Sequence, residues 1–299
     1  MKIVNFGSLN LDHVYQVAHA VTTGETIAAR DYKITVGGKG LNQSLAVARA
    51  GQAIYHAGFV GKGGDGLVEC LKESGVDVSL LQITSTPQGH AVIQVNEKGN
   101  NCIVIFGGSN QQMSKEYIDQ ALRQFEEGDY VIVQNEVSNV PYIICRAWEK
   151  GCRVIFNASP VDEDVLKIDY NKIAWLIINE LEGMAISGAQ EISQIIPVLS
   201  NRFPKLNVIL TLGNDGSVGY IDGKIYRQKA LPAKVVDTTA AGDTFLGYCV
   251  AGLLSGDAIE DILRIATAAS SVAISVPGAA PSIPRREQVN AYLRQLEEQ

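Results

Sequence analysis

Residues 131–158 read VIVQNEVSNVPYIICRAWEKGCRVIFNA, and this stretch contains a complete strand–helix–strand pattern. Short apolar runs stand near its two ends, VIVQ at 131–134 and VIFNA at 154–158, and each has the length of a buried strand. Between them, residues 140–151 mix apolar and polar side chains as an amphipathic helix does. Units of this kind build a mainly parallel sheet with helices packed on its faces.

The same alternation continues outward from this stretch toward both ends of the chain. Further strand-like runs are IVNF at 3–6 and VILTLG at 208–213. Further helical patterns stand at 41–51, 190–203, 240–256, 258–275 and 285–298. The sequence therefore predicts an α/β protein around a mainly parallel sheet.

Two segments interrupt this rhythm, residues 13–36 and 89–106. Within the second, HAVIQVNEKGNNCIVIF at 90–106 predicts two strands joined by a turn at 97–100. We interpret both segments as a small β-sheet lid. Because no repeat, low-complexity tract or Pro/Ser-rich linker divides the chain, we expect residues 1–299 to form a single domain with this lid.

The composition excludes several classes of function. The chain has 299 residues, 46% of them hydrophobic, and a formal net charge of −7, which argues against a nucleic-acid partner because such proteins carry clustered Lys and Arg. Five scattered cysteines without close pairs indicate reduced thiols, not a zinc site or a disulfide framework. The N-terminal sequence lacks the features of a signal peptide and no apolar run is long enough to span a membrane, so we expect a cytoplasmic protein.

The sequence DTTAAGDTF at 237–245 leads directly into an apolar helical pattern. The first turn of such a helix has free backbone N–H groups, which we expect from Ala240, Ala241 and Gly242. They would form an anion hole for a phosphoryl group at the positive end of the helix dipole. Asp243 stands beside this hole and suits a base that accepts a hydroxyl proton. In isolation, the same pattern could be an Asp favoured by the helix dipole and a capping Thr.

Polar side chains near the N-terminus could bind a ligand with many hydroxyl groups. Asn10 and Asp12 follow the first predicted strand, where an α/β sheet places ligand groups. The loop GGKGLNQS at 37–44 presents Lys39 and Asn42 from a glycine-rich backbone. An ordinary tight turn with a solvated Lys is the alternative interpretation.

Two better-known glycine-rich loops do not fit the chain. The dinucleotide fingerprint requires Gly where Gln43 stands. Near VGKGG at 60–64, the Walker pattern requires Gly at His56 and Ser or Thr at Gly63.

Together, GGKGLNQS and DTTAAGDTF resemble the two signature regions of the PfkB carbohydrate kinases, and of the ribokinases among them in particular. The resemblance extends along the chain through short segments that have the family's order and spacing. These are GSLNLDH at 7–13, GET at 24–26, QNE at 134–136, NASP at 157–160, NELE at 179–182, TLGNDG at 211–216 and PGAAPSIP at 277–284.

The resemblance implies a three-layer α/β/α ribokinase-like fold with a lid that closes over the sugar and forms a homodimer with a second lid. The implied reaction is the ATP-dependent phosphorylation of the primary 5-hydroxyl of D-ribose or a closely related pentose, with Asp243 as the base. Deoxyribose, fructose and nucleosides stay open as acceptors. A non-catalytic sugar sensor and an oxidoreductase with an unusual Gly loop are alternatives from other classes, disfavoured by the complete anion-hole segment and by the failed dinucleotide spacing.

Residue by residue, the resemblance implies the following binding sites. The sugar contacts are Asn10, Asp12, Gly38, Lys39, Asn42, Glu136 and Asp243. The ATP contacts are Asn179, Thr211, Leu212, Gly213, Asn214, Asp215, Gly216, Gly242 and Thr267.

The resemblance also implies two kinds of cation. Glu182, with Asn179 of NELE, would organise Mg²⁺ largely through water, although NELE could also simply begin a helix. An activating K⁺ would lie among Asp237, Thr239, Ala273, Val276, Gly278 and Ser282.

Four positions depart from the family's pattern. Leu41 stands where ribokinases commonly have Ala and could reshape the sugar pocket. Tyr248 replaces a small residue, and we favour helix packing over a role at the nucleotide. Val276 and Pro277 stand where basic residues are expected. Of the four histidines, we expect His13 to come near the sugar, because it follows Asp12.

Overall fold

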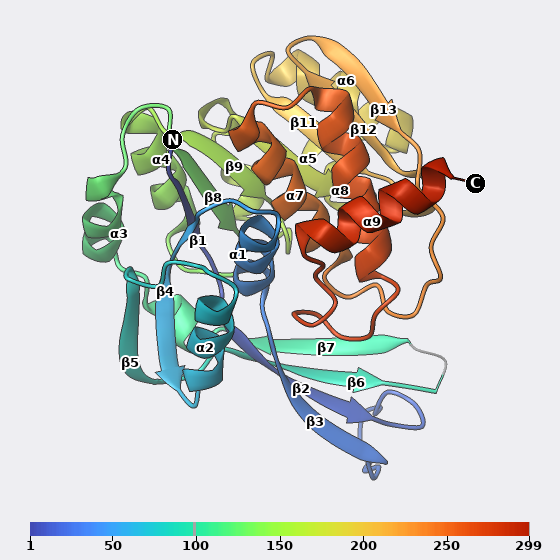
Figure 1. Ribbon diagram of the computed structural model, residues 1–299. Helices are drawn as coiled ribbons and strands as arrows, with labels where there is room; N and C mark the ends of the chain where they lie inside the picture. Colours follow the sequence, from blue (N-terminus) through green and yellow to red (C-terminus); the bar gives the residue numbers. More distant parts are fainter. Residues whose placement is uncertain (98–99, 299) are drawn as a thin grey trace.

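The computed structural model describes residues 1–97 and 100–298, and a nine-stranded sheet lies at its centre (Figure 1). In spatial order the strands are β13-β12-β11-β10-β9-β8-β1-β4-β5. Pairing is parallel from β5 to β11, and it is antiparallel between β11 and β12 and between β12 and β13 at one edge. The bounds are β1 (Ile3–Phe6), β4 (Tyr55–Lys62), β5 (Leu81–Pro87), β8 (Tyr130–Gln134), β9 (Arg153–Asn157), β10 (Trp175–Asn179), β11 (Asn207–Thr211), β12 (Ser217–Ile221) and β13 (Lys224–Gln228). The predicted mainly parallel sheet is confirmed.

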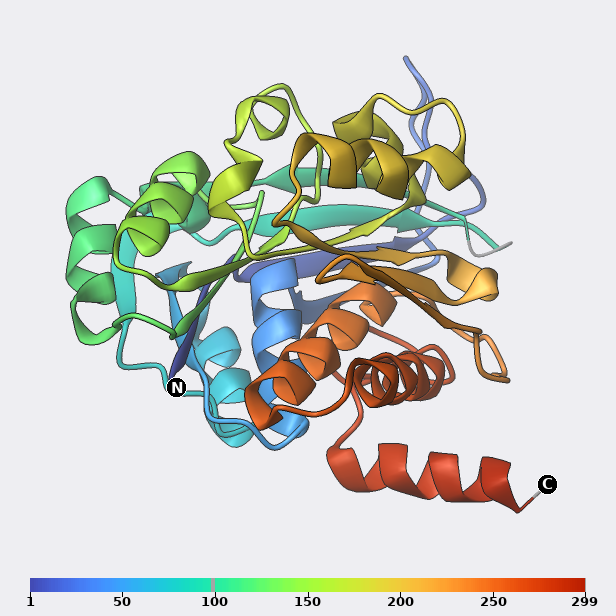
Figure 2. The same cartoon turned by 90° about the horizontal axis from the view of Figure 1, so that it is seen from above.

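Helices cover both faces of this sheet (Figure 2). One face carries α1 (Lys39–Arg49), α2 (Asp65–Glu73), α7 (Ala241–Ser255), α8 (Ile259–Ala273) and α9 (Arg286–Glu297). The other carries α3 (Lys115–Ala121), α4 (Val140–Glu149), α5 (Glu180–Ser187) and α6 (Ile192–Arg202). Short 3₁₀ turns are η1 (Gly108–Gln112), η2 (Leu122–Gln124), η3 (Val165–Lys167), η4 (Tyr170–Lys172) and η5 (Gly213–Asp215). Within the described ranges, no helix combines the length and the apolar character needed to cross a membrane.

Successive side chains of each central strand belong alternately to two layers of the core, one on each face of the sheet. In β8, Val131 and Val133 pack toward α4, whereas Tyr130 and Ile132 belong to the core under α1 and α7. Successive strand side chains point to opposite faces, so a strand covered on both faces is apolar throughout. This explains why the strand at 131–134 reads as a continuous apolar run.

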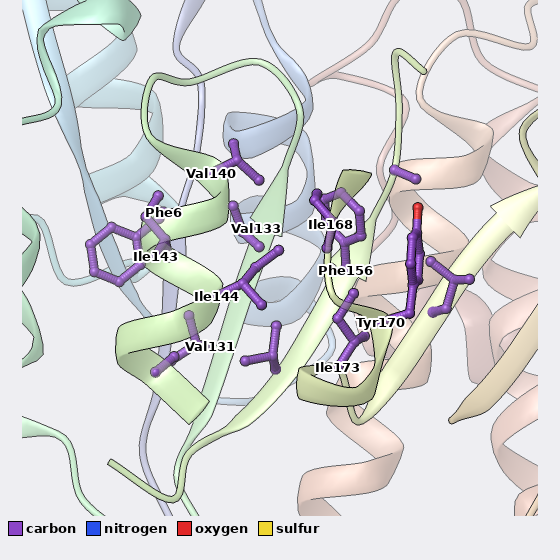
Figure 3. Packing of buried hydrophobic residues seen from close by; sticks show 14 of the residues in the cluster. Phe6, Val131, Val133, Val140, Ile143, Ile144, Phe156, Ile168, Tyr170 and Ile173 are labelled. Atoms are coloured by element: carbon purple, nitrogen blue, oxygen red, sulfur yellow. The ribbon is translucent and has the colours of Figure 1, made fainter. Parts of the chain in front are cut away.

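The stretch 131–158 folds as predicted, with β8, α4 and β9 in succession. Val140, Ile143 and Ile144 recur at helical spacing and are fully buried against Val133 and its neighbours (Figure 3). Burial of each such side chain stabilises the fold by about 1.5–3 kcal/mol. The helix ends before Gly151, whose positive φ of 75° suits glycine at a helix C-terminus.

A separate four-stranded sheet lies beside the main body (Figure 1). Its spatial order is β3-β2-β6-β7, with β2 (Asn10–Gln16), β3 (Asp31–Gly37), β6 (His90–Val95) and β7 (Asn101–Phe106). These strands come from the two segments that interrupt the α/β rhythm, except that β2 begins at Asn10, before the predicted segment 13–36, and so includes Asn10 and Asp12. The predicted turn at 97–100 includes residues 98–99, which lie outside the described residues. That this sheet acts as a lid, and that the whole chain is one domain, stay predictions.

The main sheet reverses its direction of growth at β1. The chain moves outward from β1 to β4 and β5, and then returns to place β8 on the other side of β1. In α/β proteins ligands bind at the carboxyl ends of the strands beside such a switch point. The fold therefore places Asn10 and Glu136, which follow β1 and β8, at the same edge of the sheet.

Candidate active site

Two cavities of about 210 and 260 Å³ adjoin at this edge and share Thr211, Ala241 and Gly242. The smaller lies between the TLGNDG loop, α7 and α8, and is lined by Thr211, Gly213, Asn214, Gly216, Ala230, Leu231, Ala233, Val235, Ala241, Gly242, Phe245, Thr267, Ser270, Ser271 and Ile274. The larger is lined by Lys39, Asn157, Ser159, Ile177, Ile178, Asn179, Glu182, Thr211, Thr238, Ala240, Ala241, Gly242 and Asp243. One cleft thus links the GGKG loop to the start of α7.

The start of α7 presents free amides to this cleft. Ala240 adopts a left-handed conformation with φ of 60° and caps the helix through its carbonyl, which accepts from the Thr244 N–H at 2.8 Å. The Ala241 N–H donates to the Thr238 carbonyl at 3.2 Å, so of the three predicted amides this one is engaged. Within the described chain, the N–H groups of Gly242 and Asp243 have no hydrogen-bond acceptor. Free amides at the positive end of a helix are groups that can bind an anion.

Two side-chain amides from α1 hold the Asp243 carboxylate in place. Asn42 Nδ2 donates to Oδ2 and Gln43 Nε2 donates to Oδ1, each at 2.9 Å. Asp243 is thus oriented toward α1 and lines the larger cavity instead of pointing into packed interior. Sequence reasoning included Asn42 but overlooked Gln43, which it treated only as a missing glycine.

Lys39 stands among carboxylates in the larger cavity. Burial opposes its charged form, but Asp243, Glu136 and Glu182 outweigh this effect and raise the pKa of Lys39. The ammonium group therefore stays protonated. A positive charge in a cavity that is also lined by Gly242 and Asp243 suits the binding of a phosphoryl group.

Asp12, on β2, and Glu136, after β8, lie close enough for their charges to interact. Ser8 Oγ donates to Glu136 Oε2 at 2.5 Å and the Lys39 N–H donates to the same oxygen at 3.2 Å. Burial raises the pKa of Glu136 despite these contacts. Burial and the nearby Glu136 raise the pKa of Asp12 to about 7. Carboxyl groups in such a polar, enclosed place can accept hydrogen bonds from hydroxyl groups of a ligand.

Asn10 is held by a residue that sequence reasoning missed. Asn110, in η1, donates from Nδ2 to Asn10 Oδ1 at 2.7 Å, and its own Oδ1 accepts from the Leu9 N–H at 2.9 Å. Asn10 and Asn110 are 3% and 2% exposed, so both side chains are fixed. No sequence signal could have found Asn110, because it lies 100 residues from its partner.

Close backbone approach explains the glycines of the GGKG loop. A Cβ on Gly40 would lie 2.3 Å from the Ser8 N and 2.4 Å from the Gly7 Cα. Gly38 has φ of 96° and lies against the backbone of Ser8 and Asn10. The loop therefore packs directly against the residues that follow β1. Of the predicted sugar contacts, Lys39 and Asp243 line the larger cavity, whereas Asn10, Asp12, Gly38, Asn42 and Glu136 line none of the three cavities.

The predicted nucleotide contacts divide between two places. Thr211, Gly213, Asn214, Gly216, Gly242 and Thr267 line the smaller cavity, and Asn179 lines the larger one. Leu212 instead lines a separate cavity beside α6, and Asp215 lines none of the three cavities. Gly216 has φ of 92° and lies against the Gln228 carbonyl, which fixes the turn of this loop.

NELE begins α5 with reciprocal contacts between Asn179 and Glu182. Asn179 Oδ1 accepts from the Glu182 N–H at 2.9 Å, and Glu182 Oε2 accepts from the Asn179 N–H at 3.1 Å. Both residues also line the larger cavity, so the helix-start and binding interpretations are compatible. In the described chain no three His, Cys, Asp or Glu side chains are grouped as direct metal ligands. Asn179 and Glu182 place side-chain oxygens at the wall of this cavity, and oxygens of this kind can hold Mg²⁺ through water.

The predicted K⁺ residues are only partly brought together. Asp237 accepts from the Thr239 N–H and Oγ1 at 2.9 and 2.6 Å, and from the Gly278 N–H at 2.8 Å. Burial opposes the charged carboxylate, but these hydrogen bonds outweigh it and lower the pKa of Asp237. The segment around Gly278 contains Ala273, Val276 and Ser282. These three residues form hydrogen bonds within this segment. An ionised carboxylate at this position offers the oxygen ligands that hard cations prefer.

The residues that depart from the family's pattern lie outside both cavities. Leu41 is fully buried in the core beneath α1, so any effect on the sugar pocket would act through packing. Tyr248 is 1% exposed and donates to the Pro284 carbonyl at 3.0 Å, in agreement with a packing role. Val276 is exposed. His13 contacts Tyr32 at 2.7 Å on the second sheet.

Comparisons with known proteins identify the family. The pattern of the pfkB family carbohydrate kinases matches residues 1–286. A ribokinase from Lactococcus lactis subsp. lactis is 30% identical over 303 residues, covering 99% of this chain and 98% of the relative. The crystal structure of a ribokinase from Cryptococcus neoformans var. grubii in complex with ADP superimposes with a TM-score of 0.87 at 31% identity, covering 97% of this chain and 99% of that chain.

A second solved structure shows the same fold. The Arabidopsis thaliana ribokinase complexed with ribose and ATP superimposes with a TM-score of 0.83 at 30% identity, covering 98% of each chain. The predicted ribokinase-like α/β fold is confirmed by both superpositions. The prediction of an ATP-dependent carbohydrate kinase is likewise confirmed, and the chain belongs to the pfkB family of carbohydrate kinases.

Proposed function

We propose that this chain transfers the γ-phosphoryl group of ATP to the primary 5-hydroxyl of D-ribose or a closely related pentose. One observation carries the proposal. The Asp243 carboxylate lies beside the free amides of Gly242 and Asp243, in a cavity that also contains Lys39. The ribose and ATP in the Arabidopsis ribokinase structure, and the ADP in the Cryptococcus one, support these substrates.

We assign the sugar to the space between the GGKG loop and the second sheet. Asn42 uses its amide nitrogen to hold Asp243, while its buried Oδ1 has no partner within the described chain. A buried carbonyl oxygen without a donor is unfavourable, so a sugar hydroxyl that donates to it would be bound favourably. Asp12 and Glu136 would accept from further hydroxyls, and Asn10 and Gly38 shape the other side of the site.

We assign the triphosphate to the amides at the start of α7 and the adenosine to the smaller cavity. Gly213, Gly216 and the alanines there leave room for a flat base, and Thr267 lies at its wall. Thr267 Oγ1 donates to the Leu263 carbonyl at 2.8 Å, so its methyl group is held in a fixed orientation. Asn179 and Glu182 lie at the phosphate end of the cleft.

In the proposed reaction the sugar hydroxyl oxygen forms the new bond to the γ-phosphorus. The bond from this phosphorus to the β,γ-bridging oxygen breaks, and ADP leaves with that electron pair. The hydroxyl proton moves to Asp243, while the Gly242 and Asp243 amides and the Lys39 ammonium stabilise charge on the phosphoryl oxygens. The products are ribose 5-phosphate, ADP and one proton.

We further propose that Mg²⁺ and K⁺ support this reaction. Mg²⁺, bound through water near Glu182, would neutralise charge on the triphosphate. K⁺ near Asp237 would stabilise the loop that leads into α7. Turnover measured with tetramethylammonium in place of K⁺ should fall, and equal turnover in both salts would contradict the K⁺ assignment.

We also propose a homodimer formed through the second sheet. Its strands β3 and β7 expose apolar side chains, with Ile34 52%, Val104 69% and Phe106 49% exposed. A cluster of this kind is typical of an interface between copies of a chain. Sedimentation should show a dimer that Val104→Asp weakens, and a monomer at micromolar concentration would refute the proposal.

The kinase assignment is tested by Asp243→Asn, which removes the base and keeps the amides. We expect kcat to fall by about 10²–10⁴-fold with ATP binding retained. Asp261→Asn is the matched control, because Asp261 is exposed in the first turn of α8 and lines neither cavity. Near-normal turnover of Asp243→Asn would reject the base.

The acceptor is tested with a panel of D-ribose, deoxyribose, fructose and nucleosides under ATP and Mg²⁺. We expect the highest kcat/KM for D-ribose. No turnover of ribose would remove it as the substrate, and turnover of another acceptor would keep the kinase proposal with a different sugar.

A further inference from the structure

We propose that Gln43 is a positioning residue for the reaction, which orients the carboxylate of Asp243 and is itself oriented by a buried network of polar side chains. This inference rests on the proposed role of Asp243 as the base. The network consists of Gln43, Gln134, Asn5, Ser44 and His56, which are all 0% exposed. None of these five residues was assigned to the site from the sequence.

The network begins at the Asp243 carboxylate and ends at two backbone carbonyls, that of Gly7 after β1 and that of Gly40 in α1. Gln43 Nε2 donates to Asp243 Oδ1 at 2.9 Å, and Gln43 Oε1 accepts from Gln134 Nε2 at 2.7 Å. Gln134 Nε2 also donates to Asn5 Oδ1 at 2.9 Å. Asn5 Nδ2 donates to the Gly40 carbonyl and to Ser44 Oγ, both at 2.9 Å.

The last link is a neutral histidine. Ser44 Oγ lies 2.8 Å from His56 Nδ1, and His56 Nε2 lies 3.2 Å from the Gly7 carbonyl. A carbonyl can only accept, so the Nε2 atom carries the proton and Nδ1 accepts from the Ser44 hydroxyl. Burial lowers the pKa of His56 to about 4, in agreement with a neutral ring at physiological pH.

The two carbonyls determine the direction of every hydrogen bond in the network. Because the Ser44 hydroxyl donates to His56, Ser44 must accept from Asn5, whose amide nitrogen also faces the Gly40 carbonyl. Asn5 Oδ1 then faces Gln134, whose nitrogen must serve two oxygens. Gln43 can therefore only turn its oxygen to Gln134 and its N–H to Asp243. A reversed Gln43 would place its oxygen against the carboxylate and its nitrogen against that of Gln134.

This arrangement keeps a hydrogen-bond donor on Oδ1 of the base, and Asn42 supplies the donor on Oδ2. Two fixed donors determine the plane of the carboxylate, and catalysis depends steeply on such positioning. Lys39 on α1 and Glu136 after β8 interact electrostatically with Asp243, and Glu182 on α5 lines the same cavity as Asp243. Gln43 also donates to Asn157 Oδ1 at 3.3 Å, which ties the base to the end of β9.

The test is Gln43→Met, which keeps the length of the side chain and removes its N–H and its oxygen. We expect kcat to fall about 10- to 100-fold, as for loss of a hydrogen bond to a charged group, with KM for sugar and ATP within about twofold. Gln52→Met is the matched control. Gln52 also links the end of α1 to α7, by donating to Ser255 Oγ at 2.8 Å, and it lines neither cavity. Circular dichroism and thermal melting check that the variants fold.

A second variant gives a readout that a merely structural role would not move. Gln43→Glu places a second carboxylate 2.9 Å from Asp243, and the two groups would share one proton. The acid limb of the kcat–pH profile should then move upward by about one pH unit or more. Gln134→Met should lower kcat without moving this limb, because it only releases the orientation of Gln43.

The outcomes separate this inference from the kinase proposal. If the wild-type protein phosphorylates none of the acceptors in the panel, the kinase proposal is refuted and this inference is refuted with it. An active wild-type protein whose turnover is lowered no more by Gln43→Met than by Gln52→Met would refute the positioning role alone. An unshifted pH profile in Gln43→Glu would refute it as well.

Discussion

Acidification should destabilise this protein through His56, and the effect can be estimated from the structure. The ring is 0% exposed, and burial lowers its pKa from 6.5 to about 4. Between these two pH values the unfolded chain binds a proton at His56 that the folded chain does not, so stability falls as pH falls. The slope is about 1.4 kcal/mol per pH unit, which amounts to about 3 kcal/mol over the whole range. This is a large part of the 5–15 kcal/mol by which domains are typically stable.

The perturbation that isolates this effect is His56→Gln, which cannot titrate. At pH 7 the variant should be less stable than the wild type, because Ser44 loses the ring nitrogen to which it donates. As pH falls from 6.5 to 4, only the wild type loses the His56 contribution, so the gap between the two proteins should shrink by about 3 kcal/mol. Urea unfolding at half-unit pH steps measures this gap.

Other groups do not obscure the comparison. Because the pKa of Asp12 is raised to about 7, protonation of Asp12 stabilises the folded protein as the pH falls. This effect is opposite in sign to that of His56, but it is the same in both proteins. His19→Gln is the control, since His19 lies on the surface and pairs with Glu25 at 2.8 Å. A gap between wild type and His56→Gln that stays constant from pH 7 to pH 4 would refute the neutral buried ring.

Two further predictions test the packing around the site. Gly40→Ala should destabilise the protein by about 1–3 kcal/mol or more, because the added Cβ would meet the backbone of Gly7. The control is Gly66→Ala on α2, where the added Cβ has open space. This control should be neutral or stabilising by up to about 1 kcal/mol. Equal urea midpoints for both variants would contradict this. Tyr248→Phe should cost about 1–3 kcal/mol by leaving the Pro284 carbonyl unpaired, with KM for ATP unchanged. An altered KM would instead support a role of Tyr248 at the nucleotide.

Much of the site could be predicted because its motifs are local. GGKG, NELE, TLGNDG and AAGD each combine special backbone geometry with a polar side chain within a few residues, and such combinations are visible in a sequence. The order of strands and helices was also predictable, because burial on one or both faces of a strand leaves a direct pattern of apolar residues. The neighbouring strands β6 and β7 of the second sheet were also predictable, whereas the antiparallel β12–β13 edge and the pairing of β2 with β3 and β6 left no such pattern.

Gln43, Gln134 and Asn110 show what such local patterns miss. Gln43 and Gln134 stand inside the quoted segments GGKGLNQS and QNE, yet nothing in these segments says that two side chains 91 residues apart meet at 2.7 Å. Asn110 stands outside every motif and still holds Asn10. The roles of these three side chains depend on the partners that the fold brings to them, and the residue types alone do not reveal these roles.

The sequence by itself determined the alternation of strands and helices, the glycines where backbones must approach closely, and the chemical groups available to a kinase. Only the tertiary structure decided which donors reach the Asp243 carboxylate, since Asn42 and Gln43 lie 201 and 200 residues away from it. The physical reason is that local propensities act over a few residues, whereas buried polar groups must find partners wherever the packed chain brings them.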